Sequence, residues 1–155
     1  MKLQRIVLRY AAVSVVASFF LAGPLHAAKD AVPTPKEYGV YVKTATKLVR
    51  LLPNIVFQEG AMLYIESNNP PHFPLKDIKY FIFYGKHDLS YLTFNYLLFV
   101  NQSPLGISRF IFGKVVEIEA KNKNDALYTV RPKGLFGRGY YALWINDSAW
   151  DFIVE

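Results

Sequence analysis

The chain contains no cysteine, and this absence excludes several kinds of chemistry together. Disulfide bonds, thiolate ligands for metals and thiol nucleophiles all require that residue. Histidine is scarce too: after residue 27 only His72 and His87 remain, and their spacing is unlike that of metal ligands. We therefore expect no metal site and no cofactor.

Long apolar runs are also missing. The longest lies near the start, over Tyr10–Ala22, and is shorter than the roughly 20 residues of a membrane-spanning helix. It follows a basic start and ends close to the small residue Ala27, an order typical of a secretory signal peptide. We predict a signal peptide over residues 1–27 with cleavage after Ala27, export to a bacterial periplasm or exterior, and no transmembrane segment in the mature chain.

Charge is modest once this leader is removed. Three of the 18 Lys and Arg residues precede position 28, whereas all 12 acidic residues follow it, so the net charge falls from +6 to +3. No block of basic residues stands out. Since nucleic-acid binding requires a concentrated basic face, we expect no nucleic-acid partner.

The pattern after the leader predicts an all-β fold. Residues 28–37 form a flexible N-terminal arm in this interpretation, and residues 38–155 form a single domain. Short apolar or alternating runs with turn residues between them are typical of strands, and no segment shows a convincing helical period. We predict a β-sandwich, or a partly closed barrel, of about 8–9 short, mostly antiparallel strands.

Two local features refine this prediction. Three prolines within residues 67–74 predict an exposed extended loop, because proline cannot donate a ladder hydrogen bond. Residues 107–119 show one continuous run of strand character.

The strands near residues 80–84 and 91–99 are apolar on both faces, whereas a sandwich strand usually has one polar face. Either a loop, the N-terminal arm or a short helix covers the second face, or the second face is an exposed patch for a partner or an apolar ligand. The candidate contact residues are Tyr80, Phe81, Phe83, Tyr84, Tyr91, Phe94 and Tyr96.

Catalytic patterns are weak. His87, Asp88 and Ser90 are the residue types of a hydrolase triad, but near neighbours in sequence do not align as a triad requires. Glu117 and Glu119 share one strand face, which suits either a solvated surface or the paired carboxylates of a glycan hydrolase. We expect no catalytic residue in the chain.

The corner at residues 134–139 contains three glycines and favours a tight turn rather than a phosphate loop, because a strand and not a helix follows it. Cations near this corner could still hold a carboxylate or phosphate. The candidate anion-binding residues are Arg131, Lys133 and Arg138.

Two segments resemble small exported bacterial β-domain proteins. The segment Tyr128–Glu155, which reads YTVRPKGLFGRGYYALWINDSAWDFIVE, is similar to their closing hairpin. Gly39–Tyr41 followed by Lys47–Leu51 is similar to their opening hairpin. Arg138 stands where those proteins usually have proline. The resemblance implies an exported β-domain and transfers no catalytic residue.

These observations lead to two functional hypotheses. The first is a non-enzymatic module of the bacterial cell envelope that binds another envelope protein, or itself, through the aromatic strands. The second is a carrier or sensor that holds a small apolar or lipid-like ligand between its sheets. An envelope glycan hydrolase is a third and weaker alternative.

Overall fold

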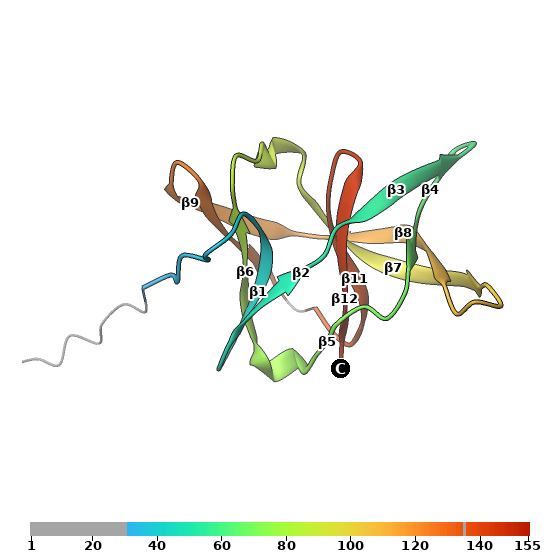
Figure 1. The fold of residues 1–155 in the computed structure, drawn as a ribbon, viewed down its shortest axis with the longest axis horizontal. Helices are drawn as coiled ribbons and strands as arrows, with labels where there is room; N and C mark the ends of the chain where they lie inside the picture. The colour runs from blue at the N-terminus through green and yellow to red at the C-terminus, as the bar shows by residue number, and fades with distance from the viewer. Residues whose placement is uncertain (1–30, 135) are drawn as a thin grey trace, which may run out of the picture. The chain divides into compact units, whose positions relative to one another are not determined.

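The computed structural model describes residues 31–134 and 136–155 (Figure 1). The predicted signal peptide, residues 1–27, and residues 28–30 of the predicted arm lie outside the described residues. The chain divides into two units, Met1–Val32 and Pro33–Glu155, and the fold below is that of the second unit.

Strands dominate this unit, which confirms the predicted all-β class. The two helices among the described residues are single 3-10 turns, Leu75–Asp77 (η1) and Leu89–Tyr91 (η2), and neither could cross a membrane. The strands are β1 Gly39–Thr44, β2 Leu48–Leu51, β3 Asn54–Glu59, β4 Met62–Ser67, β5 His72–Phe73, β6 Ile78–Tyr84, β7 Thr93–Gln102, β8 Ser108–Val116, β9 Ile118–Asn124, β10 Leu127–Pro132, β11 Gly139–Ile145 and β12 Ser148–Val154.

The strands exceed the predicted number for two reasons. The run at residues 107–119 is divided at Glu117, where the chain leaves one sheet as β8 and enters the other as β9. The proline-rich segment contains β5, which pairs in parallel with the end of β12 and buries Phe73. The expectation that this whole segment is an exposed loop is therefore wrong, because an apolar side chain in it reaches the core.

The strands form two sheets. One is antiparallel, with the order β2-β1-β6-β10-β9. The other has the order β11-β7-β8-β4-β3-β12, and the pairing of β11 with β12 closes it into a six-stranded barrel, with β5 added at β12. A β-sandwich combined with a closed barrel satisfies the predicted fold.

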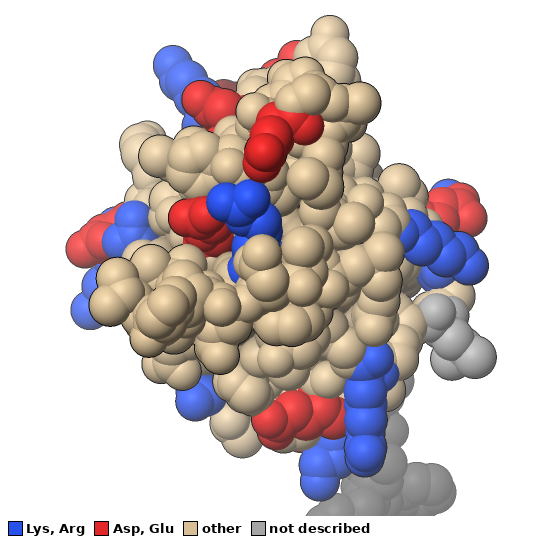
Figure 2. All heavy atoms as spheres, turned by 90° about the vertical axis from the view of Figure 1, so that its right-hand side faces the viewer, with Lys and Arg blue, Asp and Glu red and all other residues tan. Residues whose placement is uncertain are grey.

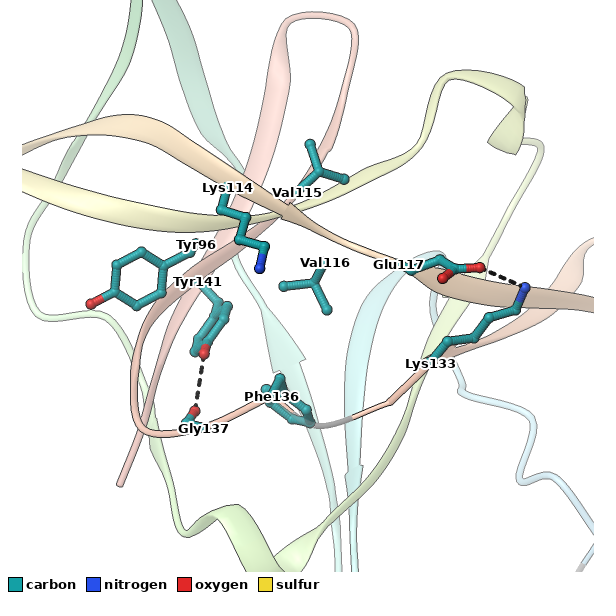
Figure 3. Close-up of a pocket in the computed structure, with 9 residues that line it drawn as sticks. All are labelled: Tyr96, Lys114, Val115, Val116, Glu117, Lys133, Phe136, Gly137 and Tyr141. Atoms are coloured by element: carbon teal, nitrogen blue, oxygen red, sulfur yellow. Dashed lines mark hydrogen bonds and ion pairs between the residues drawn. The ribbon is translucent and has the colours of Figure 1, made fainter.

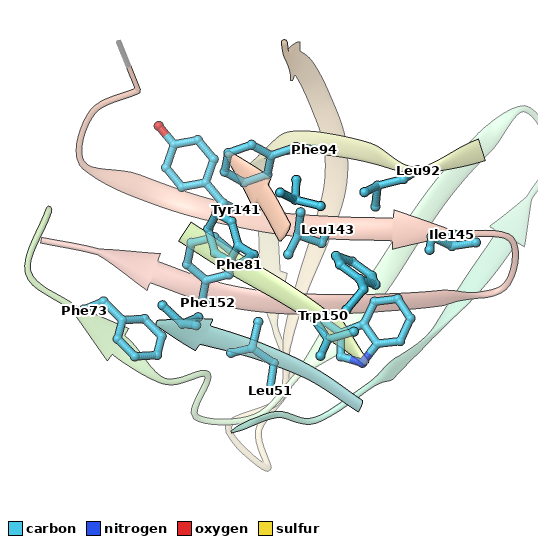
Figure 4. Packing of buried hydrophobic residues seen from close by; sticks show 14 of the residues in the cluster. Leu51, Phe73, Phe81, Leu92, Phe94, Tyr141, Leu143, Ile145, Trp150 and Phe152 are labelled. Carbon is cyan, nitrogen blue, oxygen red and sulfur yellow. The ribbon is translucent and has the colours of Figure 1, made fainter. Parts of the chain in front are cut away.

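Two apolar cores lie on opposite faces of the β11–β12 hairpin. Successive side chains of a strand point to opposite faces. Leu143 and Trp150 accordingly join the core between the two sheets, whereas Ala142 and Ala149 join a smaller core made by barrel strands only. The larger core is rich in aromatic rings (Figure 4). This hairpin is therefore buried on both sides.

Candidate functional site

Most of the predicted contact residues lie in the core. Phe81, Phe83 and Phe94 are 0% exposed, and Tyr80 is also buried. The ring centroids of Phe81 and Phe94 are 5.6 Å apart, so these side chains pack against each other across the two sheets. The prediction of an accessible contact surface is wrong for these four residues, because burial in the core leaves them nothing to offer a partner.

The second face of β6 is covered by neighbouring side chains. Tyr84 meets the ring of Tyr38 edge-on, with centroids 5.0 Å apart. The guanidinium of Arg131 lies 4.8 Å from the centre of the Tyr80 ring. Tyr84 and Tyr96 are half-buried, whereas Tyr91 is 69% exposed in η2. The alternative of a covered strand face therefore describes β6.

Two of the three predicted anion-binding residues have other partners. Arg131 lies over Tyr80, and Lys133 forms an ion pair with Glu117, 3.0 Å between nitrogen and oxygen. The hydrogen bond that Lys133 donates to Glu117, followed by the negative charge of Glu117, raises the pKa of Lys133. Arg138 is exposed. Among these three residues only Lys133 lines the pocket described below.

The remaining polar candidates have structural partners. The His72 ring contacts the carboxylate of Glu155, and His87 packs edge-on against Trp150. Within residues 31–134 and 136–155, no group of His, Asp and Glu side chains could hold a metal ion. Glu117 and Glu119 each pair with a different lysine, Lys133 and Lys121.

A pocket of about 430 Å³ opens beside the corner that joins β10 to β11 (Figure 3). It lies where the chain passes between the sheets twice, at the β8–β9 junction and between β10 and β11. The lining residues are Tyr96, Lys114, Val115, Val116, Glu117, Lys133, Phe136, Gly137 and Tyr141. Its volume is in the range of small-molecule sites.

Glycine and aromatic residues fix the inner wall of this pocket. Gly139 adopts φ +150°, and a Cβ atom there would lie 2.4 Å from Cε2 of Tyr96. The Tyr96 ring meets the Tyr141 ring edge-on at 5.4 Å. The Tyr141 hydroxyl donates to the carbonyl of Gly137, 3.1 Å away, and partial burial raises the pKa of Tyr141. This bond ties the corner loop to β11.

Phe136 connects the pocket to the main core. Its ring lies 5.7 Å from Phe94 and 5.5 Å from Tyr141, in edge-on contacts with both. A ligand in the pocket would therefore touch a ring that is packed against the centre of the domain.

A second feature is the apolar outer half of the β7–β8 hairpin. β11 pairs with β7 only at residues 93–96, so residues 97–102 have β8 on one edge and no paired strand on the other among the described residues. Leu98, Phe99 and Val100 are all exposed there, and Leu105 follows in the turn. The shift in register between Phe99 and Asn101 interrupts the alternation, as β-bulges do.

The face that contains the ends of the β3–β4 and β7–β8 hairpins carries few charges (Figure 2). Its charged groups include Arg109, which bonds to Glu66 at 2.9 Å and to Glu59 at 3.3 Å, and which lies over the Tyr64 ring. The positive charge of Arg109 is thus balanced locally. The exposed side chains of the outer β7–β8 hairpin are therefore mainly apolar, at Leu98, Phe99 and Val100.

A buried carboxyl group lies inside the barrel. Asp151 accepts hydrogen bonds from Asn54 and Ser67, and desolvation by burial raises its pKa against the opposing effect of those bonds. Asn95 is buried two strands away from Asp151, because Ala142 of β11 pairs with Asp151 on one side and with Asn95 on the other. The Oδ1 atom of Asn95 has no hydrogen-bond partner among the described residues. This cluster links β3, β4 and β12.

Comparison of the chain with protein-family models, with curated proteins and with solved structures gives no match. The functional argument therefore depends on the geometry of the pocket and of the β7–β8 hairpin. Sequence analysis did not select Lys114, Val116 or Phe136 of the pocket, because its walls come from segments far apart in sequence. It interpreted the apolar strand at residues 91–99 as a possible contact patch, but it did not select Leu98 to Val100 individually.

Proposed function

We propose that this chain is a non-enzymatic module of the bacterial cell envelope and that its N-terminal segment directs its export. In this proposal the chain binds a second copy of itself through the free edge of β7. One observation carries the proposal: residues 97–102 combine exposed apolar side chains with a strand edge that no other described segment pairs with. Such an edge presents backbone N–H and C=O groups to any strand that approaches it.

A second copy is the partner that this edge suits best. Two identical strands can pair in antiparallel orientation about a two-fold axis, so that backbone N–H groups of each edge donate to C=O groups of the other. The segment Leu97–Gln102 contains no charged residue, and its self-pairing would bring no like charges together. Phe99, which is 60% exposed, would supply an aromatic anchor of the kind that is frequent in interfaces.

Sedimentation equilibrium of the protein purified from its cells tests this proposal. We expect a concentration-dependent dimer. The variant Phe99→Lys should weaken it by about tenfold or more, because two lysines would face each other across the axis. The matched control Leu52→Lys changes a leucine that is 74% exposed outside β7 and should leave the dimer unchanged.

Two results would contradict the proposal. One is a monomer at every concentration up to about 1 mM, which corresponds to the weakest association of interest. The other is a dimer that Phe99→Lys and Leu52→Lys affect equally, since this would place the contact away from β7.

A further inference from the structure

The pocket beside the corner at residues 133–138 has an apolar part and a charged part. Tyr96, Phe136 and Tyr141 contribute aromatic rings, and Val115 and Val116 add aliphatic surface. Such a mixture of apolar walls and a few polar groups is typical of small-molecule sites, where the polar groups fix the orientation of the ligand.

The charged part has an excess of one positive charge. Lys133 and Glu117 neutralise each other in their ion pair. Lys114 has no ion pair or hydrogen bond of its side chain among the described residues, and its ammonium group extends towards Tyr141 and Val116 (Figure 3). The lining contains no arginine and no second free lysine. A ligand with a single negative charge would match this arrangement.

We propose that the pocket binds a small monoanionic carboxylic acid, with its apolar body against Tyr141 and Phe136 and its carboxylate on the ammonium group of Lys114. This binding activity goes beyond the self-association proposed above and involves other residues. A carboxylate suits the site better than a phosphate does, because one lysine balances one charge and the lining contains no guanidinium group to hold a dianion.

The position of the pocket gives binding a measurable consequence for stability. Its walls belong to β7, β8 and β11 of the barrel and to both segments that pass from one sheet to the other. A ligand that contacts Val116 and Phe136 together would bind only when these segments are in place. Ligands that bind the folded state alone raise its stability by RT ln(1 + [L]/Kd).

Two pairs of probes separate the contribution of charge from that of shape: 1-naphthoate with 1-naphthamide, and hexanoate with hexanamide. Each pair has one apolar body and differs in charge. We expect at least one acid to bind in calorimetric titration, about tenfold more tightly than its amide, and to raise the midpoint of thermal unfolding.

Three variants assign the contacts. Lys114→Met keeps most of the length of the side chain but removes the charge, and should abolish the preference for the acid. Lys47→Met, at an exposed lysine in the β1–β2 turn, should leave it intact. Phe136→Ala should weaken the binding of the acid and of the amide alike, because the Phe136 ring contacts the apolar body of the ligand.

The proposal is wrong if neither acid binds at up to about 10 mM, a concentration that would detect even weak affinity. It is also wrong if acid and amide bind equally, or if Lys114→Met retains the preference. Thermal unfolding of each variant without ligand shows whether it is folded. None of these results depends on the dimer, so failure of self-association would leave this test unaffected.

Discussion

The contact between Gly139 and Tyr96 makes a quantitative prediction about the substitution Gly139→Ala. A Cβ atom at Gly139 would lie 2.4 Å from Cε2 of Tyr96, about 1 Å inside ordinary van der Waals contact. The ring or the strand must then move, and overpacking of this kind costs about 1–3 kcal/mol. The backbone at φ +150° adds strain of about 1–3 kcal/mol for a residue other than glycine.

A smaller term opposes these two. Replacement of glycine by alanine restricts the unfolded chain and stabilises the fold by about 0.4–1 kcal/mol. We therefore expect Gly139→Ala to lower the free energy of unfolding by about 1–6 kcal/mol. Urea denaturation followed by circular dichroism measures this change.

Two other glycines separate the contributions. At Gly60, φ is +60° and a Cβ atom would meet nothing within 4 Å, so Gly60→Ala should show backbone strain alone. The φ angle of Gly137 lies outside this positive range, and a Cβ atom there would also meet nothing within 4 Å. Gly137→Ala should therefore be neutral or slightly stabilising. A Gly139→Ala effect no larger than that of Gly60→Ala would refute the reasoning, as would strict additivity with Tyr96→Ala in a double-mutant cycle.

Three further predictions concern the core and two titrating groups. Phe94→Ala should lower the free energy of unfolding by about 3–5 kcal/mol in the same urea assay, because Phe94 is buried. Tyr91→Ala should lower it by less than about 0.5 kcal/mol, because Tyr91 is exposed. The reverse order would contradict the burial of Phe94. Desolvation lowers the pKa of His87, so its contribution to stability is present above the ordinary pKa of 6.5 and lost as the pH falls through the folded-state pKa. His87→Gln should therefore reduce the loss of stability on acidification. Burial raises the pKa of Asp151, whose contribution to stability is present below the ordinary 3.8 and lost as the pH rises through the folded-state pKa. Asp151→Asn should therefore gain stability relative to the wild type as the pH rises above about 3.8, and a constant difference would contradict this.

Local patterns were sufficient to predict most of the strands, because alternation and turn residues act within a few positions. Residues 134–139 were correctly interpreted as a corner, with Gly134 and Gly139 at positive φ. The proline-rich segment was misjudged at Phe73 because pairing of β5 with β12 is a contact between distant parts of the chain. The signal peptide, the resemblance to exported β-domains and the cellular location stay predictions.

Burial of β6 could not be decided from the sequence. Its apolar run fits both a covered strand and an exposed patch, because what lies over a strand depends on tertiary structure. The cover comes from Tyr38 before β1 and from Arg131 on β10. The pocket was hidden for the same reason: Lys114 and Phe136 come from different strands and loops and meet only in the folded chain.

The hairpin of β11 and β12 has a consequence for how the domain unfolds. Because one side of it completes the core between the sheets and the other completes the barrel, neither core can lose this hairpin without the other losing it too. The two cores should therefore melt in a single cooperative transition. The amide protons of Ala142, Leu143 and Phe152 should then exchange with solvent only through global unfolding, at the slowest rate in the protein.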